Sequence, residues 1–270
     1  MNEDIVQFSV NEVGVATVTM NRPELHNAFD DTLIPRLHAV LQGLEADPQV
    51  RVVVLAARGR SFSAGADLQW MRRVAGQTES QNVQDATRMA ELMRTLDRMG
   101  KPTIARVQGA AFGGGVGLVA CCDMAVAARE AVFCLSEVRL GLIPAVISPY
   151  VIRAMGERAA RRWFLTAERF DADTALRTGL LTDVVDADRL DARVAELAGH
   201  LLAGGPQAIA AAKDLIHAVS AQPVDRAVLE DTARRIASAR AGPEGREGVS
   251  AFLEKREPAW RSPRPSPAQP

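Results

Sequence analysis

A glycine-rich stretch and one glutamate carry the clearest chemistry in this sequence. The stretch, GAAFGGGVG, runs from Gly109 to Gly117, and Ser136-Glu137-Val138-Arg139 follows about twenty positions later. Glycines have no side chains, so a ligand can approach the main chain and N–H groups can converge on developing negative charge. A carboxylate nearby can move protons. The pattern therefore predicts an acid–base site built on backbone amides.

A second cluster of small residues offers another amide to the same site. Phe62-Ser63-Ala64-Gly65-Ala66-Asp67 forms a tight turn ahead of a helical pattern that begins at Leu68. Two main-chain amides on one carbonyl oxygen favour a thioester or amide substrate. Asp67 itself could be catalytic, but we favour an N-cap role because Asp is a preferred residue directly before a helix.

Glu137 directly follows an apolar, strand-like run, so we expect its carboxylate to lie in a dry environment that raises its pKa. The alternative is an ion pair with Arg139. We weigh that alternative less, because residues two apart on an extended segment share a face but compete for the same solvent.

The elements that would position these residues alternate between strands and helices in the first half, which is typical of an α/β domain with crossover connections. Strands are predicted at Ile5–Val10, Val15–Met20, Val52–Ala56, Thr103–Val107, Met124–Ala127 and Val132–Leu135. Helices are predicted at Asp31–Ala46, Leu68–Val74, Val83–Met99 and, briefly, after Gly115.

From about Pro149 the pattern becomes almost wholly helical, and its alanine-rich segments suit close packing against a neighbouring element or subunit. The predicted helices are Glu157–Thr166, Ala172–Thr178, Ala187–Leu202, Pro206–Ser220, Val224–Ala239 and Gly245–Arg256. The last ten residues, 261–270, are rich in Pro and Ser and are predicted to be a flexible end.

Composition narrows the classes of function. The 270 residues are 47% apolar and carry a net charge of −1, so we expect a small-molecule partner and neither nucleic acid nor a membrane. Three cysteines and four scattered histidines form no disulfide or metal pattern, so no metal is expected. The N-terminus shows no leader and no segment has eighteen uninterrupted apolar residues, which favours the cytoplasm.

Two other interpretations of the glycines remain open. Residues 115–120 satisfy G-x-G-x-x-A, a dinucleotide-binding pattern with Glu137 at the distance of a ribose-binding acid. This match is weak, because the strand Thr103–Val107 ends several residues before the glycines. The glycines could also serve only close packing of helix against sheet, although five of them within nine residues exceed that need.

With these residues assembled, the chain resembles the crotonase, or enoyl-CoA hydratase/isomerase, superfamily over nearly its whole length. The matching motifs are Met20-Asn21-Arg22-Pro23 with His26-Asn27-Ala28, residues 62–68, 101–105 and 108–115, Cys122-Asp123-Met124-Ala125, Ser136-Glu137 to Pro144, and Phe252-Leu253-Glu254-Lys255-Arg256. The resemblance implies an α/β fold: a spiral of ββα units with the acyl-CoA thioester site over residues 1–200, a helical trimerisation region over 201–260, a tail over 261–270, and a homotrimer or homohexamer.

The resemblance also implies site roles. The N–H groups of Ala66 and Gly114 would bind the thioester oxygen, with Glu137 as the catalytic carboxylate. CoA, as part of the substrate and not a resident cofactor, would contact Arg22, His26, Ala64, Ala66, Asp67 and Leu68, and Phe252 and Lys255 would reach the CoA of a neighbouring subunit. The acyl group would lie near Gly113, Gly117 and Arg139.

One departure bears on mechanism. Where typical hydratases of the family carry a first glutamate two residues past the third glycine, this chain has Gly117. Residues 136–170 are similar to a bacterial branch that hydrates 3-methylglutaconyl-CoA in leucine breakdown or the isohexenyl analogue in acyclic terpene breakdown. We therefore expect a hydro-lyase for a branched 2-enoyl-CoA, with Arg139 or the Arg72–Arg73 pair as candidates for a distal carboxylate. A single-glutamate isomerase and a catalytically idle acyl-CoA-binding scaffold are the alternatives.

Overall fold

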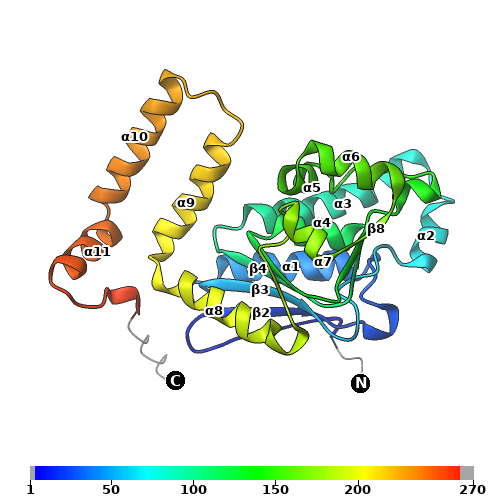
Figure 1. Cartoon of the computed structure of the whole chain (residues 1–270), viewed down its shortest axis with the longest axis horizontal. Coiled ribbons are helices and arrows are strands. Elements are labelled where there is room, and N and C mark those ends of the chain that lie inside the picture. The colour runs from blue at the N-terminus through cyan, green and yellow to red at the C-terminus, as the bar shows by residue number, and fades with distance from the viewer. Residues whose placement is uncertain (1–3, 262–270) are drawn as a thin grey trace.

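A six-stranded sheet forms the centre of the computed structural model, which describes residues 4–261 (Figure 1). Its strand order is β1-β2-β3-β4-β6-β9; β1 pairs antiparallel with β2 and all the other pairs are parallel. The strands are β1 (Val6–Val10), β2 (Val15–Met20), β3 (Val52–Ala57), β4 (Thr103–Val107), β6 (Met124–Ala128) and β9 (Asp183–Val185). All six residues of β3 are buried, as expected of a parallel strand covered on both faces.

A smaller sheet holds the glycine-rich segment. It consists of β5 (Ala110–Phe112), β7 (Val132–Cys134) and β8 (Arg169–Asp171), in the order β5-β7-β8. Phe133 stacks on Phe170 with 5.5 Å between ring centroids, and Phe170 lies 4.5 Å from Trp163 of α6. This aromatic cluster fixes the sheet against its covering helix, and with it the start of α4.

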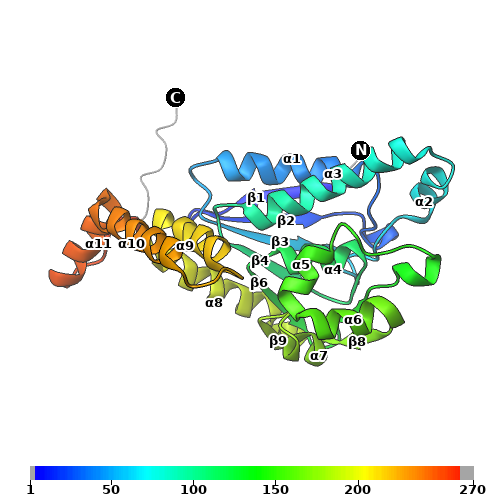
Figure 2. The same cartoon turned by 90° about the horizontal axis from the view of Figure 1, so that it is seen from above.

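Helices cover both faces of the large sheet (Figure 2). On one face α1 packs its buried leucines against β1 and β2, with α3 beside it; on the other, α8 contacts β3, β4 and β6. The helices of this core are α1 (Leu33–Ala46), α2 (Leu68–Val74), α3 (Glu79–Arg98), α4 (Gly114–Cys121), α5 (Ser148–Met155), α6 (Glu157–Thr166), α7 (Ala172–Arg177) and α8 (Leu190–Ala203). Short 3-10 helices are η1 (Pro23–Leu25), η2 (Glu137–Leu140), η3 (Ala187–Arg189) and η4 (Ala259–Arg261).

Three helices form an arm at the end of the molecule opposite α2 (Figures 1 and 2). They are α9 (Pro206–Val219), α10 (Arg226–Ala241) and α11 (Pro243–Leu253). Lys213 of α9 joins the arm to the core, because its Nζ atom donates to Asp123 Oδ2 at 2.6 Å and to the Lys101 carbonyl at 2.9 Å. Arg51 adds hydrogen bonds to the carbonyls of Leu202 and Gly204.

The α/β class and the six predicted strands are confirmed, with ends that differ by at most one residue. The predicted helices are also present, although that at 83–99 begins four residues earlier, at Glu79, where Thr78 and Gln81 form a capping box. The prediction of an almost wholly helical second half was wrong, because β8 and β9 lie there. Both have only three residues, too short for an alternating pattern. Of the predicted flexible end, only Arg261 lies within the described residues, as the last residue of η4.

Candidate active site

Asn27 organises the base of the site from the segment that links β2 to α1. It is fully buried and has a left-handed backbone, with φ 54°, a conformation that Asn tolerates better than most residues. Its Nδ2 atom donates to the carbonyls of Arg58 and Ser61, both at 2.9 Å, and its Oδ1 atom accepts from the Arg22 amide at 2.9 Å. One side chain thus connects two chain segments thirty residues apart in sequence.

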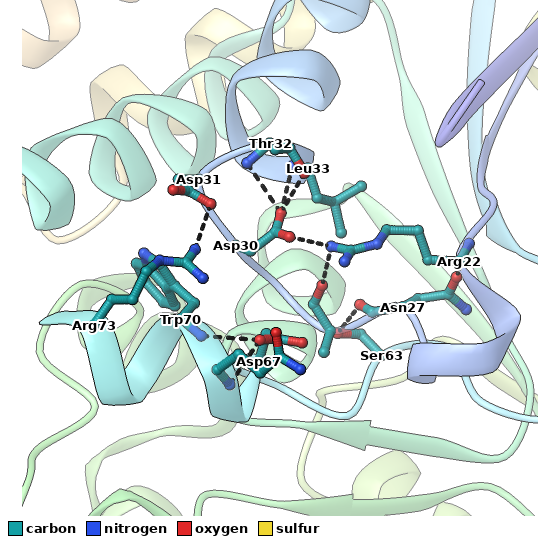
Figure 3. Close-up of polar contacts among 12 residues, drawn as sticks. Arg22, Asn27, Asp30, Asp31, Thr32, Leu33, Ser63, Asp67, Trp70 and Arg73 are labelled. Atoms are coloured by element: carbon teal, nitrogen blue, oxygen red, sulfur yellow. Dashed lines mark hydrogen bonds and ion pairs between the residues drawn. The ribbon is translucent and has the colours of Figure 1, made fainter. Parts of the chain in front are cut away.

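Ser63 connects the same segment to the loop that carries Ala66 (Figure 3). Its hydroxyl donates to the Asn27 carbonyl at 2.9 Å. Its backbone also pairs with β5: the Ser63 amide donates to the Ala110 carbonyl, and the Phe112 amide donates to the Ser63 carbonyl. The loop at 63–67 therefore lies directly along the glycine-rich segment.

Gly65 permits the closest approach between these two segments. It has φ +89°, and a Cβ atom at this position would stand 3.2 Å from the Phe112 carbonyl oxygen. On the other side of the contact, a Cβ atom on Gly115 would stand 3.0 Å from Ser63. Side chains at either position would push the two segments apart.

Two backbone donors remain free where these segments meet. Within residues 4–261, neither the Ala66 nor the Gly114 N–H group donates a hydrogen bond to a protein acceptor, although their neighbours do. The Asp67 amide donates to the Phe29 carbonyl at 2.9 Å, and the Gly113 amide donates to the Cys134 carbonyl at 2.9 Å. Gly114 is also the first residue of α4, where N–H groups have no partner inside the helix. A pair of free donors of this kind suits a carbonyl oxygen that gains negative charge.

Asp67 caps α2, as the sequence predicted. Its Oδ1 atom accepts from the amides of Gln69 at 2.8 Å and Trp70 at 2.9 Å (Figure 3). The neighbouring Ala64, Ala66 and Leu68 are exposed, and Leu68 retains 73% of its accessible surface. The loop therefore presents a small apolar surface beside the free Ala66 amide.

Glu137 lies against the start of α4. Its Oε1 atom is 3.1 Å from the place a Cβ atom would occupy on Gly113, which has φ +50°. Desolvation raises the pKa of Glu137, in the predicted direction, and Oε2 is buried without a hydrogen-bond partner. The segment is the 3-10 helix η2 rather than an extended chain, and within the described chain Arg139 forms no ion pair with Glu137. A half-buried glutamate with a raised pKa and a free, buried carboxylate oxygen is suited to proton transfer.

Gly117 lies one turn beyond Gly114 on the same face of α4. A Cβ atom on Gly117 would stand 2.2 Å from Ile147 Cγ2 and 3.0 Å from Met93 Cε. Apolar groups of Ile147 and Met93 therefore fill the space that a side chain at position 117 would occupy.

Arg22 and His26 flank η1, on the segment that links β2 to α1. Arg22 Nη1 forms a largely buried ion pair with Asp30 at 2.6 Å, with only 12% and 11% of the two side chains exposed. His26 Nδ1 lies 3.1 Å from the Ser61 hydroxyl, and its Nε2 atom lies 3.2 Å from Arg60 Nη2. Part of Arg22 is thus used inside the fold, and its contact with pyrophosphate stays a prediction, as does that of His26.

Phe252 and Lys255 lie on and just after α11, at the end of the molecule away from α2 (Figures 1 and 2). Phe252 is 81% exposed. The structure does not bring these two residues to Glu137 of the same chain, so their predicted contact with a neighbouring subunit's substrate stays a prediction. Of the candidates for a distal carboxylate, Arg73 is paired with Asp31 at 2.8 Å, and Arg139 is exposed without an ion pair among the described residues.

Residue types alone did not predict the positioning roles of Asn27, Ser63 and Asp30. Asn27 and Ser63 lie in motifs that carry the family resemblance, but no role was predicted for them. Their side chains donate to main-chain carbonyl groups, and no sequence pattern reveals such partners. Asp30 accepts from the Thr32 and Leu33 amides and so caps α1, although it lies three residues before that helix. An Asp ahead of an apolar helical pattern was the available signal.

Several known proteins are similar to this chain in sequence and in architecture. A family model described as "Enoyl-CoA hydratase/isomerase" matches residues 11–263. A crystal structure of an enoyl-CoA hydratase from Shewanella pealeana superimposes with a TM-score of 0.93 at 47% identity, covering 96% of this chain and 97% of that one. Crotonyl-CoA hydratase of Syntrophomonas wolfei is 31% identical over 91% of this chain and 94% of its own length. The 2,3-dehydroadipyl-CoA hydratase of Escherichia coli is 33% identical over 92% of this chain and 95% of its own length.

Proposed function

This chain belongs to the enoyl-CoA hydratase/isomerase family, and from that premise we propose that it is a hydro-lyase that adds water to a branched 2-enoyl-CoA. The observation that carries the proposal is the pair of free amides at Ala66 and Gly114 together with the half-buried carboxylate of Glu137 against the start of α4. Enzymes of this family act on acyl-CoA thioesters, and a thioester oxygen is the natural acceptor for two such donors.

In the proposed reaction the two amides hold the thioester oxygen while enolate character develops on it. Each such donor contributes roughly 3 kcal/mol to stabilising the transition state in comparable sites. Glu137 removes a proton from the attacking water, the water oxygen bonds to the β-carbon, and the carboxylic acid then returns the proton to the α-carbon. One carboxylate suffices because the proton it takes is the proton it gives back.

CoA would lie across the outer side of the 58–68 segment. The exposed surface of Ala64, Ala66 and Leu68 suits the adenine ring, and the basic groups of Arg22 and His26 suit the pyrophosphate. Arg60, hydrogen-bonded to His26, adds a further positive charge there.

A homotrimer or a homohexamer would complete the site. The arm exposes several large apolar side chains that the monomer leaves uncovered: Ile216, Leu229, Ile236, Val249, Phe252 and Leu253. Burial of these groups against a second copy would bring Phe252 and Lys255 towards that copy's CoA. Residues 1–200 would then form the catalytic core, and 201–260 the trimerisation region.

The acyl group would carry a branch and a distal carboxylate, as in 3-methylglutaconyl-CoA. Arg139 supports this choice, because its unpaired guanidinium lies two residues after Glu137 and is exposed. One relative takes its name from 2,3-dehydroadipyl-CoA, which is also the thioester of a dicarboxylic acid. A role in leucine breakdown follows from this substrate. The three free cysteines fit a reducing cytoplasm, and no helix within residues 4–261 has the length and apolar character needed to cross a bilayer.

A substrate panel tests the proposal. Purified protein is incubated with crotonyl-CoA, 3-methylglutaconyl-CoA and longer branched 2-enoyl-CoA esters in ¹⁸O-labelled water, and each product is analysed by mass spectrometry. The hydro-lyase predicts ¹⁸O in a 3-hydroxyacyl product, with the dicarboxylic ester preferred. Transfer of the double bond to the 3-position without ¹⁸O would instead establish the isomerase, which Glu137 alone could also support. Binding of all esters without turnover would establish the idle scaffold.

A further inference from the structure

Two glycines on one face of α4 are packed directly by side chains from three other segments. A Cβ atom on Gly114 would stand 2.7 Å from Met89 Cε and 3.0 Å from the Phe29 ring. One turn later, a Cβ atom on Gly117 would stand 2.2 Å from Ile147 Cγ2. Real Cβ contacts are never this short, so Ile147 occupies the space of a side chain at 117.

The two glycines differ in how much of this face is open. Gly114 and Met89 are partly exposed, whereas Gly117 is buried, Ile147 is 4% exposed and Met93 is fully buried. The accessible part of the site therefore lies at the free Gly114 amide and ends one turn further along α4, at Ile147. The atoms nearest to the Gly117 Cβ position at that end are apolar groups of Ile147 and Met93.

Ile147 has little freedom to move away. Its carbonyl accepts hydrogen bonds from the amides of Tyr150 and Val151, both at 3.1 Å, at the start of α5. A β-branched side chain at such a position is also restricted in χ1. Met93 borders the same space, since its Cε atom would stand 3.0 Å from a Cβ atom on Gly117, and its sulfur lies 3.7 Å from Cys121 Sγ in the core.

We propose that Ile147 is the specificity-determining residue of this site: it fills the space beside Gly117, closes the acyl chamber on the α4 side, and limits the acyl group that fits there. The inference rests on the proposed function, since it assumes that an acyl thioester lies between Gly114 and Glu137. Ile147 is thus the residue that sets the size of the acyl group in the proposed function. Its apolar side chain also keeps this wall of the chamber free of a second carboxylic acid.

A double-mutant cycle tests the steric contact independently of substrate. Gly117→Ala alone is expected to lower the melting temperature by at least about 2 °C, because the added methyl group would overpack this part of the core. In the Ile147→Ala background the same substitution should cost clearly less, since the colliding Cγ2 is gone and only the contacts with the residue 147 Cβ at 2.9 Å and with Met93 Cε at 3.0 Å remain. Full tolerance of Gly117→Ala in the native background, or an unchanged cost in the Ile147→Ala background, would overturn the assignment.

Acyl preference tests the role itself. The ratio of kcat/KM for 2-octenoyl-CoA to that for crotonyl-CoA is measured for the native protein, Ile147→Ala and Val151→Ala. Val151 is fully buried on the same helix one turn further on, so its truncation is the matched core control. Ile147→Ala should raise the ratio at least about tenfold, and Val151→Ala should leave it unchanged.

The role of Ile147 and the proposed function can be contradicted separately. If the native protein turns over enoyl-CoA esters but Ile147→Ala leaves the chain-length ratio unchanged, the role of Ile147 is wrong and the proposed function stands. If the native protein neither binds nor turns over any enoyl-CoA ester, the proposed function is wrong and the role of Ile147 falls with it.

Discussion

The Oε1 atom of Glu137 lies 3.1 Å from the place where a side chain on Gly113 would begin. Nothing but backbone therefore separates this carboxylate from the first turn of α4. Gly113 also has φ +50° and donates its amide to Cys134, which holds the turn that leaves the next amide, that of Gly114, free. The proposed catalytic base, Glu137, thus lies beside the same short stretch of main chain that carries the proposed oxyanion donor at Gly114.

Glu137→Gln should remove most of the activity. The amide keeps the size of the side chain but cannot accept a proton from water, and general-base catalysis typically contributes about 10²- to 10⁴-fold to the rate. We expect kcat to fall by that amount, while the dissociation constant for a saturated acyl-CoA measured by calorimetry stays within about threefold. Glu130→Gln, at an exposed residue, is the control. Unchanged turnover would favour the idle scaffold.

The pH dependence of stability should also change in Glu137→Gln. Desolvation raises the pKa of Glu137 above its usual value of 4.5, so the folded state binds the proton more tightly than the unfolded chain does. The native protein therefore loses stability as the pH rises from 4.5 through the raised pKa. Glu137→Gln should melt higher than the native protein at pH 8, and the difference should vanish below about pH 4. Equal melting temperatures at pH 8 would contradict the buried charge.

Gly65→Ala should impair catalysis more than folding. Gly65 has φ +89°, and its new methyl group would meet the Phe112 carbonyl at 3.2 Å, so Ala66 and Gly114 would separate. Misplacing one oxyanion donor costs about 10²- to 10³-fold in kcat. Gly43→Ala on α1 is the matched control: no atom lies within 4 Å of its Cβ position, and it should stabilise the helix by about 0.5–1 kcal/mol. Steady-state kinetics and thermal melting of both variants measure the effects on catalysis and on stability. Full activity of Gly65→Ala would argue against a donor at Ala66.

Some elements and site residues were predictable from the sequence alone, and others were not. The glycines, Glu137 and the Asp67 cap were predictable because each depends on residue type and local order. The buried run of β3 and the helix at 157–166 were predictable for the same reason. Neither β8 nor Ile147 was predictable, because a three-residue strand has no period and the contact between Ile147 and Gly117 joins segments thirty positions apart. The same limit hid the carbonyl partners of Asn27.

Asn27→Ala should destabilise the whole base of the site. It removes three hydrogen bonds from a fully buried side chain, leaving the carbonyls of Arg58 and Ser61 without that donor. At roughly 1 kcal/mol each, with a further cost for alanine at φ 54°, the loss should be about 3–4 kcal/mol in urea unfolding. Asn82→Ala is the control, since Asn82 is exposed and its bonds of 3.2 and 3.4 Å are long. A loss below about 1 kcal/mol for Asn27→Ala would show that the loop is held by other contacts.

Lys213→Met should loosen the arm from the core while the site itself stays formed. Lys213 is only 11% exposed at its side chain, and the Asp123 oxygen it contacts also accepts from the Thr103 amide and hydroxyl. The pair is only partly buried, because the Asp123 side chain retains 26% of its accessible surface, so loss of the cation should cost about 1 kcal/mol. We expect faster hydrogen exchange in α9, measured by mass spectrometry, with unchanged exchange in β5 and α4. Lys255→Met, an exposed residue at the end of the arm, should leave the exchange of α9 unaltered. Equal protection of α9 in Lys213→Met and the native protein would mean that the arm is held mainly by its apolar contacts.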